Sequence, residues 1–214
     1  MNLPNRLTMS RLFVALGLFI MLEWIRQAST NDKVVLVSTL AYIALGLFLV
    51  AAITDFLDGF LARRRKITSD FGRIADPFAD KVLICGSLVF LTGTRGVDDI
   101  IMPWVVVIIL AREFLVTGLR GYIESRGLSF GAKAIGKLKM ILQCFLVGGG
   151  IFLLGPGRGK ESLSGLVMVI MIATVLITIY SGWLYIRVAM NVLSTPEGAQ
   201  PEATSPPEGE EPPA

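Results

Sequence analysis

The sequence contains no histidine, and this absence removes several kinds of chemistry. Without an imidazole there is no Ser-His-Asp triad, no His-ligated metal site and no proton transfer through histidine. The two cysteines, Cys85 and Cys144, both fall in long apolar stretches and offer neither a disulfide framework nor a zinc pattern. We interpret them as small buried apolar side chains. General-base chemistry in this chain therefore falls to other groups, such as carboxylates.

Charged residues are also scarce. They make up 17% of the 214 residues, against 53% hydrophobic residues, and the mean hydropathy is +0.67. This is too apolar for an ordinary soluble domain. Windows of about 20 residues give six apolar stretches, at 8–26, 34–54, 77–95, 100–122, 133–154 and 163–190. The sequence predicts an all-α membrane protein with six transmembrane helices. The glycines at 148–150 predict close helix packing.

The carboxyl-terminal segment differs in composition from the rest. Residues 194–214 hold five glutamates and six of the ten prolines, with no lysine or arginine. A segment of this kind buries too little apolar surface to fold. We therefore predict a membrane domain at 1–192 and a disordered acidic tail at 193–214, either a docking segment or a solvated terminus. The net charge of the whole chain is +3, and without the five glutamates of the tail the residues before 194 carry +8.

The distribution of lysine and arginine predicts the orientation. With six spans, one side of the membrane carries the amino terminus, the 55–80 and 120–139 connections, and Arg187. Of the 20 basic residues, 14 fall on that side, 5 on the other, and Arg112 lies within a span. Cytoplasmic loops carry the excess of basic residues, so we expect that side to be cytoplasmic. It should also favour anionic lipid headgroups.

The stretch DFLDGFLARRRKITSDFGRIADPFAD (55–80) holds four aspartates, Asp55, Asp58, Asp76 and Asp80. On a helix, Asp55 and Asp58 lie 60° apart and share a sector with the small residues Gly59 and Ala62. No aspartate of the four has a basic residue four positions later, so the spacing disfavours simple surface ion pairs. Carboxylate oxygens suit Mg²⁺, Mn²⁺ or Ca²⁺, and four of them suggest two cations against a pyrophosphate or phosphodiester. The alternative is a set of solvated or salt-bridged acids.

Pro77 complicates the second half of this stretch. Proline removes a backbone donor and disfavours helical conformation in the residue before it, here Asp76. A helix should therefore begin near Asp76 or kink there. If the helix begins there, Gly72 belongs to a loop that packs over the site.

The stretch matches the pattern DxxDGxxARx₈GxxxDxxxD at eight fixed positions: Asp55, Asp58, Gly59, Ala62, Arg63, Gly72, Asp76 and Asp80. In this it resembles the CDP-alcohol phosphotransferase family. The resemblance implies transfer of a phosphatidyl or similar group from a CDP-linked donor to an alcohol, with release of CMP. It implies that the four aspartates hold two Mg²⁺ or Mn²⁺ ions and that Asp80 is also the general base. The CDP part of the donor would lie against Gly59, Ala62, Arg63 and Gly72.

Three further stretches narrow the choice of acceptor alcohol. NLPNRLTMSRL (2–12), AREFLVTGLRGYIESRG (111–127) and GKLKMILQ (136–143) resemble bacterial phosphatidylglycerophosphate synthases, a branch of the same family. The resemblance implies CDP-diacylglycerol as donor, sn-glycerol 3-phosphate as acceptor and phosphatidylglycerophosphate as product. It also implies a homodimer in the bacterial inner membrane, with the amino terminus and active site cytoplasmic. No feature points to nucleic acid.

The acceptor's phosphate calls for cationic ligands. The candidates are Arg112, Arg120 and Lys137, of which the two arginines lie 80° apart on a helix. An arginine within a span is a functional candidate by default. The alternative for Arg112 is an ion pair with Glu113 or an aspartate. Lys137 and Lys139 could both approach from the span at 133–154, but we interpret Lys139 as an ordinary basic residue of the cytoplasmic face.

Nearer the amino terminus, Asn5, Thr8 and Arg11 lie at three-residue spacing on one helix face. They either cover the site from the amino-terminal segment, or cap the helix, or anchor it in the membrane interface.

Three other functions fit parts of the sequence. The same chemistry with inositol phosphate, serine or phosphatidylglycerol as acceptor would give a different phospholipid. An intramembrane prenyltransferase also uses aspartate-rich metal sites, but its two DxxxD-type clusters lack the DGxxAR element found here. A transporter or channel with an acidic ion path would spread its acids through the membrane and show an internal repeat, and we find no repeat.

Overall fold

The computed structural model describes residues 3–31, 33–65, 70–125, 133–155 and 160–193. Within these ranges, the side chains of 3–8, 34, 55–65, 70–77, 79–80, 124–125, 133–135 and 192–193 lie outside the description. The regular elements of the described part are all α-helices: α1 (Leu3–Thr30), α2 (Val34–Arg65), α3 (Asp70–Leu91), α4 (Pro103–Ser125), α5 (Lys133–Leu154) and α6 (Lys160–Leu193). The all-α prediction is confirmed.

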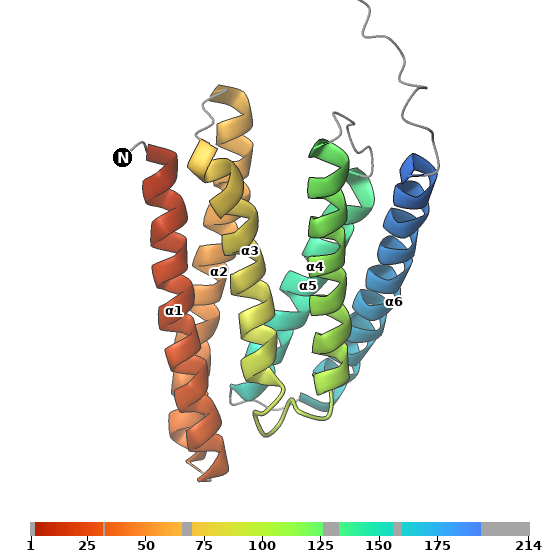
Figure 1. The fold of residues 1–214 in the computed structure, drawn as a ribbon. Coiled ribbons are helices and arrows are strands. Elements are labelled where there is room, and N and C mark those ends of the chain that lie inside the picture. Colours follow the sequence, from red (N-terminus) through yellow and green to blue (C-terminus); the bar gives the residue numbers. More distant parts are fainter. Residues whose placement is uncertain (1–2, 32, 66–69, 126–132, 156–159, 194–214) are drawn as a thin grey trace, which may run out of the picture.

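The helices form a bundle in which successive helices alternate in direction (Figure 1). The starts of α1, α3 and α5 and the ends of α2, α4 and α6 lie together at the upper end in the view. We call this the amino-terminal end of the bundle. Helix α1 packs on α2 and α3, and α6 packs on α4 and α5. The two groups meet where α2 contacts α5 and where α3 contacts α4 and α5, so α3 joins both groups.

The core follows one face of each helix. On α1, Leu18, Leu22 and Ile25 are each at most 1% exposed and recur at i, i+4 and i+7. Arg11 lies on this same face, seven residues before Leu18, and is itself buried. Since an interfacial anchor places its charge outside the bundle, the interpretation of Arg11 as such an anchor is wrong. Asn5 and Thr8 have side chains outside the description.

The outer surface of the bundle is apolar as well. Large side chains such as Phe13, Phe114 and Leu176 point outward, with 63–72% of their surface exposed. Helices that are apolar all round are typical of a membrane environment. In the described residues, four helices contain stretches long and apolar enough to cross a membrane, at Met9–Thr30, Val35–Thr54, Gly136–Leu154 and Lys160–Asn191. The protein is therefore membrane-embedded. By this measure, α3 contributes only the shorter apolar stretch Lys81–Leu91.

The two helices of the acidic motif are longer than the apolar windows predict. Helix α2 continues to Arg65 instead of ending near residue 54, and α3 begins at Asp70. The proposed helix start at Asp76 is therefore wrong, and so is the loop that would have held Gly72. Pro77 lies inside α3, eight residues into the helix. Polar residues thus extend both helices beyond their apolar parts.

Close packing at the predicted glycines is confirmed. A Cβ atom placed on Gly149 would lie 2.8 Å from Cγ2 of Val167 on α6, and one on Gly150 would lie 2.7 Å from Cδ1 of Ile101. Real Cβ atoms do not approach so closely, so hydrogen is the only side chain that fits at Gly149 without movement of the Val167 side chain or of the two helices.

We expect Gly149→Ala to destabilise the bundle. Val167 is buried and β-branched, so it cannot turn away easily. Overpacking of this kind costs about 1–3 kcal/mol. Thermal unfolding in detergent should show a lower Tm for this variant. The matched control is Gly46→Ala on α2, where the added Cβ would meet nothing within 4 Å. Equal melting temperatures for the two variants would contradict the packing argument.

Candidate functional site

The acidic motif lies on α2 and α3 near the amino-terminal end of the bundle (Figure 1). Asp55 and Asp58 precede the end of α2 by ten and seven residues, and Asp76 and Asp80 follow the start of α3 by six and ten. At 1.5 Å per residue, each pair lies about 9–15 Å in from the helix end. The two pairs are therefore at similar distances from the ends of their own helices. Their side chains lie outside the description, as do those of Gly59, Ala62, Arg63 and Gly72.

The spacing within each pair is helical, three residues on α2 and four on α3. As a set of candidate ligands, the four aspartates offer carboxylate oxygens alone. Such a set fits hard divalent cations better than zinc or copper. Outside the motif, the described residues contain no group of three or more acidic or cysteine side chains that could hold a metal.

A second polar group lies among α4, α5 and α6. It consists of six residues, which we call the polar cluster: Arg112, Glu113, Arg120, Lys139, Ser181 and Tyr185. Arg112, Glu113 and Lys139 are 6–8% exposed. Charged side chains are rarely buried unless they are paired, so each needs a partner.

Glu113 pairs with two cations. Its Oε1 accepts a hydrogen bond from Nη1 of Arg112 at 3.3 Å and another from Nζ of Lys139 on α5. The ion pair between Arg112 and Glu113, one of the two sequence interpretations, is thus present. The interpretation of Lys139 as an ordinary surface charge is wrong, because Lys139 is buried and joins α5 to α4. Two cations share one carboxylate, so the cluster keeps a net positive charge before Arg120 is counted.

Helix α6 supplies the other contacts of Arg112. The Nε–H group donates to Oγ of Ser181 at 3.0 Å, and the guanidinium carbon lies 5.4 Å from the centre of the Tyr185 ring. Gly182 leaves room for the arginine stem, since a Cβ there would lie 3.4 Å from its Cγ.

Arg120 reaches the same tyrosine. Its Nη2 donates to Oη of Tyr185 at 3.1 Å. The two arginines therefore lie on the same side of α4, as their spacing predicts.

Sequence reasoning missed the part of α6 that faces the cluster. Thr178, Ser181, Gly182 and Tyr185 recur at i, i+3, i+4 and i+7, which is one helix face. All four are buried in a helix whose sequence is mostly apolar. In such a helix, a stripe of small and polar residues indicates the face that packs against charged neighbours. This pattern could have identified the face from the sequence.

Lys137 is not part of this cluster. It is exposed on α5, two residues before Lys139, and residues two apart on a helix lie 200° apart. None of the described contacts joins Lys137 to Arg112 or Arg120. Its role at the acceptor phosphate stays a prediction.

One contact joins the helix that carries Asp76 and Asp80 to the helix that carries Arg112 and Arg120. Lys81, the residue after Asp80 on α3, donates from Nζ to Oγ1 of Thr117 on α4 at 2.5 Å. Thr117 donates its own hydroxyl hydrogen to the Glu113 carbonyl at 2.6 Å, which leaves a lone pair for the lysine. Thr117 lies between Arg112 and Arg120 in the sequence. The helix that carries Asp80 therefore meets α4 at the level of the two arginines.

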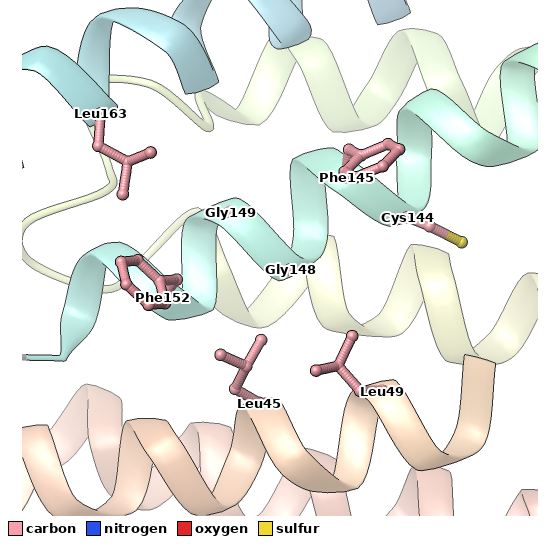
Figure 2. A pocket seen from close by; sticks show the side chains of 8 residues that line it. All are labelled: Leu45, Leu49, Cys144, Phe145, Gly148, Gly149, Phe152 and Leu163. Atoms are coloured by element: carbon pink, nitrogen blue, oxygen red, sulfur yellow. The ribbon is translucent and has the colours of Figure 1, made fainter. Parts of the chain in front are cut away.

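An apolar hollow lies between α2, α5 and the start of α6 (Figure 2). Its volume is about 350 Å³, and its lining consists of Leu45, Leu49, Cys144, Phe145, Gly148, Gly149, Phe152 and Leu163. Figure 2 shows Leu45 and Leu49 of α2 opposite the glycines of α5. The lining carries no charge, so the hollow suits hydrocarbon and cannot hold a phosphate group.

The fold and these residues define a helical membrane protein with a carboxylate-rich motif on α2 and α3 and buried cations on α4 and α5, residue types suited to phosphate chemistry at a membrane. A family model for CDP-alcohol phosphatidyltransferases matches residues 1–183. The chain belongs to the CDP-alcohol phosphatidyltransferase family.

Curated relatives carry a more specific name. The chain is 35% identical over 187 residues to a CDP-diacylglycerol–glycerol-3-phosphate 3-phosphatidyltransferase of Rickettsia typhi, covering 87% of this chain and 96% of the relative. It is also 35% identical over 150 residues to the protein of the same name in Bacillus subtilis, covering 68% and 74%. The similarity to the protein of that name in Cereibacter sphaeroides is 33% over 168 residues, covering 77% and 68%.

Proposed function

We propose that this chain transfers the phosphatidyl group of CDP-diacylglycerol to sn-glycerol 3-phosphate, forming phosphatidylglycerophosphate and CMP. Family membership supports the CDP-linked donor, and the printed names of the relatives from different bacteria support the acceptor. The complete eight-position motif and the buried cations on α4 are the residues of this chain that fit that reaction.

The observation that carries the proposal is the contact between Lys81 and Thr117. A transfer reaction needs the donor's pyrophosphate and the acceptor's hydroxyl within bonding distance of each other. Asp80 on α3 adjoins Lys81, and Arg112 and Arg120 flank Thr117 on α4. The contact therefore supports a single site in which the carboxylates serve the donor and the arginines serve the acceptor.

On the donor side, Asp55, Asp58, Asp76 and Asp80 would hold two divalent cations, Mg²⁺ or Mn²⁺. When bound, the cations neutralise the pyrophosphate and stabilise the charge on the leaving CMP. The small residues Gly59, Ala62 and Gly72 would leave space for the CDP group against the helix backbones, with Arg63 beside it.

On the acceptor side, Arg112 and Arg120, assisted by Lys137, would bind the phosphate of glycerol 3-phosphate. Arginine suits this role because its planar group donates two parallel hydrogen bonds. Asp80 would take the proton of the acceptor hydroxyl. The hydroxyl oxygen then forms a bond to the phosphatidyl phosphorus, and the bond from that phosphorus to the CMP oxygen breaks.

We further propose that all six helices cross the bacterial inner membrane, with the amino-terminal end of the bundle in the cytoplasm. The outward exposure of Val89 on α3 and Phe114 on α4 supports this for the two helices that fall short of the apolar-stretch measure. The excess of basic residues supports the orientation. We also propose a homodimer and an acidic tail at 193–214 beyond the membrane domain at 1–192. Leu193 is the last residue of α6, and residues 194–214 lie outside the described part of the chain.

An acceptor panel tests the proposed function. Purified protein with CDP-diacylglycerol and Mg²⁺ or Mn²⁺ should release CMP with sn-glycerol 3-phosphate, and far less with inositol phosphate, serine or phosphatidylglycerol. Omission of the divalent cation should stop the release. Robust release with inositol phosphate but none with glycerol 3-phosphate would refute the acceptor.

A further inference from the structure

Tyr185 is the largest of the fully buried side chains and touches two charged groups. Its ring faces the guanidinium of Arg112, and its hydroxyl accepts a hydrogen bond from Arg120. A phenylalanine would fill the same apolar space. The hydroxyl is therefore present for a reason other than packing, because a buried Tyr hydroxyl must be matched to a polar partner.

The two arginines start far apart. Eight residues separate them on α4, or about 12 Å along the helix axis. An arginine has many rotamers, and holding two of them at one ligand carries an entropy cost. Tyr185 brings both guanidinium groups to one ring, so most of that ordering is already complete before a ligand arrives.

The contacts of Arg112 leave donors for a ligand. Ser181 takes its Nε–H and Glu113 takes one hydrogen of Nη1, so two of its five N–H donors are used. Among contacts in the described ranges, its Nη2 group donates to no side chain. Arg120 likewise uses one Nη2 hydrogen in its bond to Tyr185. Contacts with α6 thus orient both arginines, and each keeps hydrogen-bond donors for an anion.

We propose that Tyr185 is a positioning residue for the acceptor phosphate, which sets the separation of Arg112 and Arg120 by placing its ring against one and its hydroxyl on the other. This inference rests on the proposed function, because it takes the two arginines as ligands of the glycerol 3-phosphate phosphate group. Tyr185 acts through Arg120 and does not itself take part in the chemistry.

The test is Tyr185→Phe, which keeps the ring against Arg112 and removes the hydroxyl that accepts the hydrogen bond of Arg120. The KM for sn-glycerol 3-phosphate should rise about tenfold, the effect of one lost hydrogen bond to a charged group. The kcat and the KM for CDP-diacylglycerol should stay near wild type. The matched control is Tyr180→Phe, which removes a hydroxyl from an exposed position of the same helix and should change neither constant.

A double-variant comparison shows whether Tyr185 acts through Arg120. Arg120→Gln alone should raise the same KM, and adding Tyr185→Phe to it should raise it little further. Independent, multiplicative effects would overturn the inference, since they would show that the hydroxyl works without Arg120. A Tyr185→Phe variant that lowers kcat with an unchanged KM would also overturn it.

A binding measurement separates this inference from the proposed function. Protection of the protein by inorganic phosphate against thermal unfolding needs no turnover, and Tyr185→Phe should require about tenfold more phosphate for the same protection. If wild type releases no CMP with glycerol 3-phosphate, the proposed function fails, and this titration still decides the inference. Equal protection of wild type and Tyr185→Phe would refute it.

Discussion

Asp80→Asn should reduce CMP release by roughly 10²–10⁴-fold while CDP-diacylglycerol still binds. An amide keeps one oxygen for a cation but cannot take the proton of the acceptor hydroxyl, and general-base catalysis contributes rate factors of about this size. The measurements are initial rates of CMP release and retention of labelled CDP-diacylglycerol by the purified variant. The neighbouring contact between Lys81 and Thr117 should survive, since the substitution leaves the size of residue 80 almost unchanged.

Asp99→Asn is the matched control for this prediction. Asp99 is an exposed aspartate in the turn between α3 and α4, at the end of the bundle away from the motif (Figure 1). Its rate should equal that of wild type. Full activity of Asp80→Asn would show that another group accepts the proton. Loss of donor binding in step with activity would assign Asp80 to cation binding alone.

Glu113→Ala should have the largest effect on stability, about 3–5 kcal/mol of unfolding free energy. The substitution leaves Arg112 and Lys139 buried side by side without the carboxylate between them, and breaking a buried pair from one side costs about this much. Denaturation in detergent micelles measures the loss. The variant should also bind glycerol 3-phosphate more weakly, because Arg112 loses one of the contacts that orient it.

A second variant keeps this prediction open to refutation. Glu113→Gln combined with Lys139→Met removes one charge of each sign, and it should recover much of the lost stability, since no uncompensated charge is added to the cluster. The exposed Glu161 at the start of α6 provides the control Glu161→Ala, with an expected change within about 0.5 kcal/mol. If Glu113→Ala is no less stable than this control, Glu113 is not a structural counter-ion.

The sequence predicts the helices of this protein well and their ends less well. Long apolar runs identify each of the six helices, because apolar length is the feature that a membrane selects. The same criterion ends α2 at 54, whereas the helix runs on to Arg65. Hydropathy measures only how apolar a segment is. It therefore cannot detect a helix that continues into polar residues beyond its apolar part. The polar extensions of α2 and α3 carry the motif, so the error falls on the residues that we propose as the donor site.

The candidate site also has a part that the sequence predicts and a part that it does not. The motif is local, so its residue types and spacing are sufficient to predict a carboxylate group on two helices. Two of the partners of Arg112 are not local, because Ser181 lies 69 residues away and Tyr185 lies further along α6. Spacing predicts which residues share a face, but it does not specify which helix that face meets. Lys139 was misassigned for this reason, since its burial depends on Glu113 of α4.

The charges of the polar cluster also bear on how the chain enters a membrane. Helix α4, which we propose as the fourth span, carries Arg112 and Glu113 near its middle. Each charged residue at the centre of a lone helix adds about 2.5–3.5 kcal/mol to the free energy of insertion. Lys139 and Ser181 lower that cost only when α5 and α6 are beside it. Helix α4 should therefore be held at the insertion machinery until α5 and α6 have been synthesised, so that the last three helices enter the bilayer together.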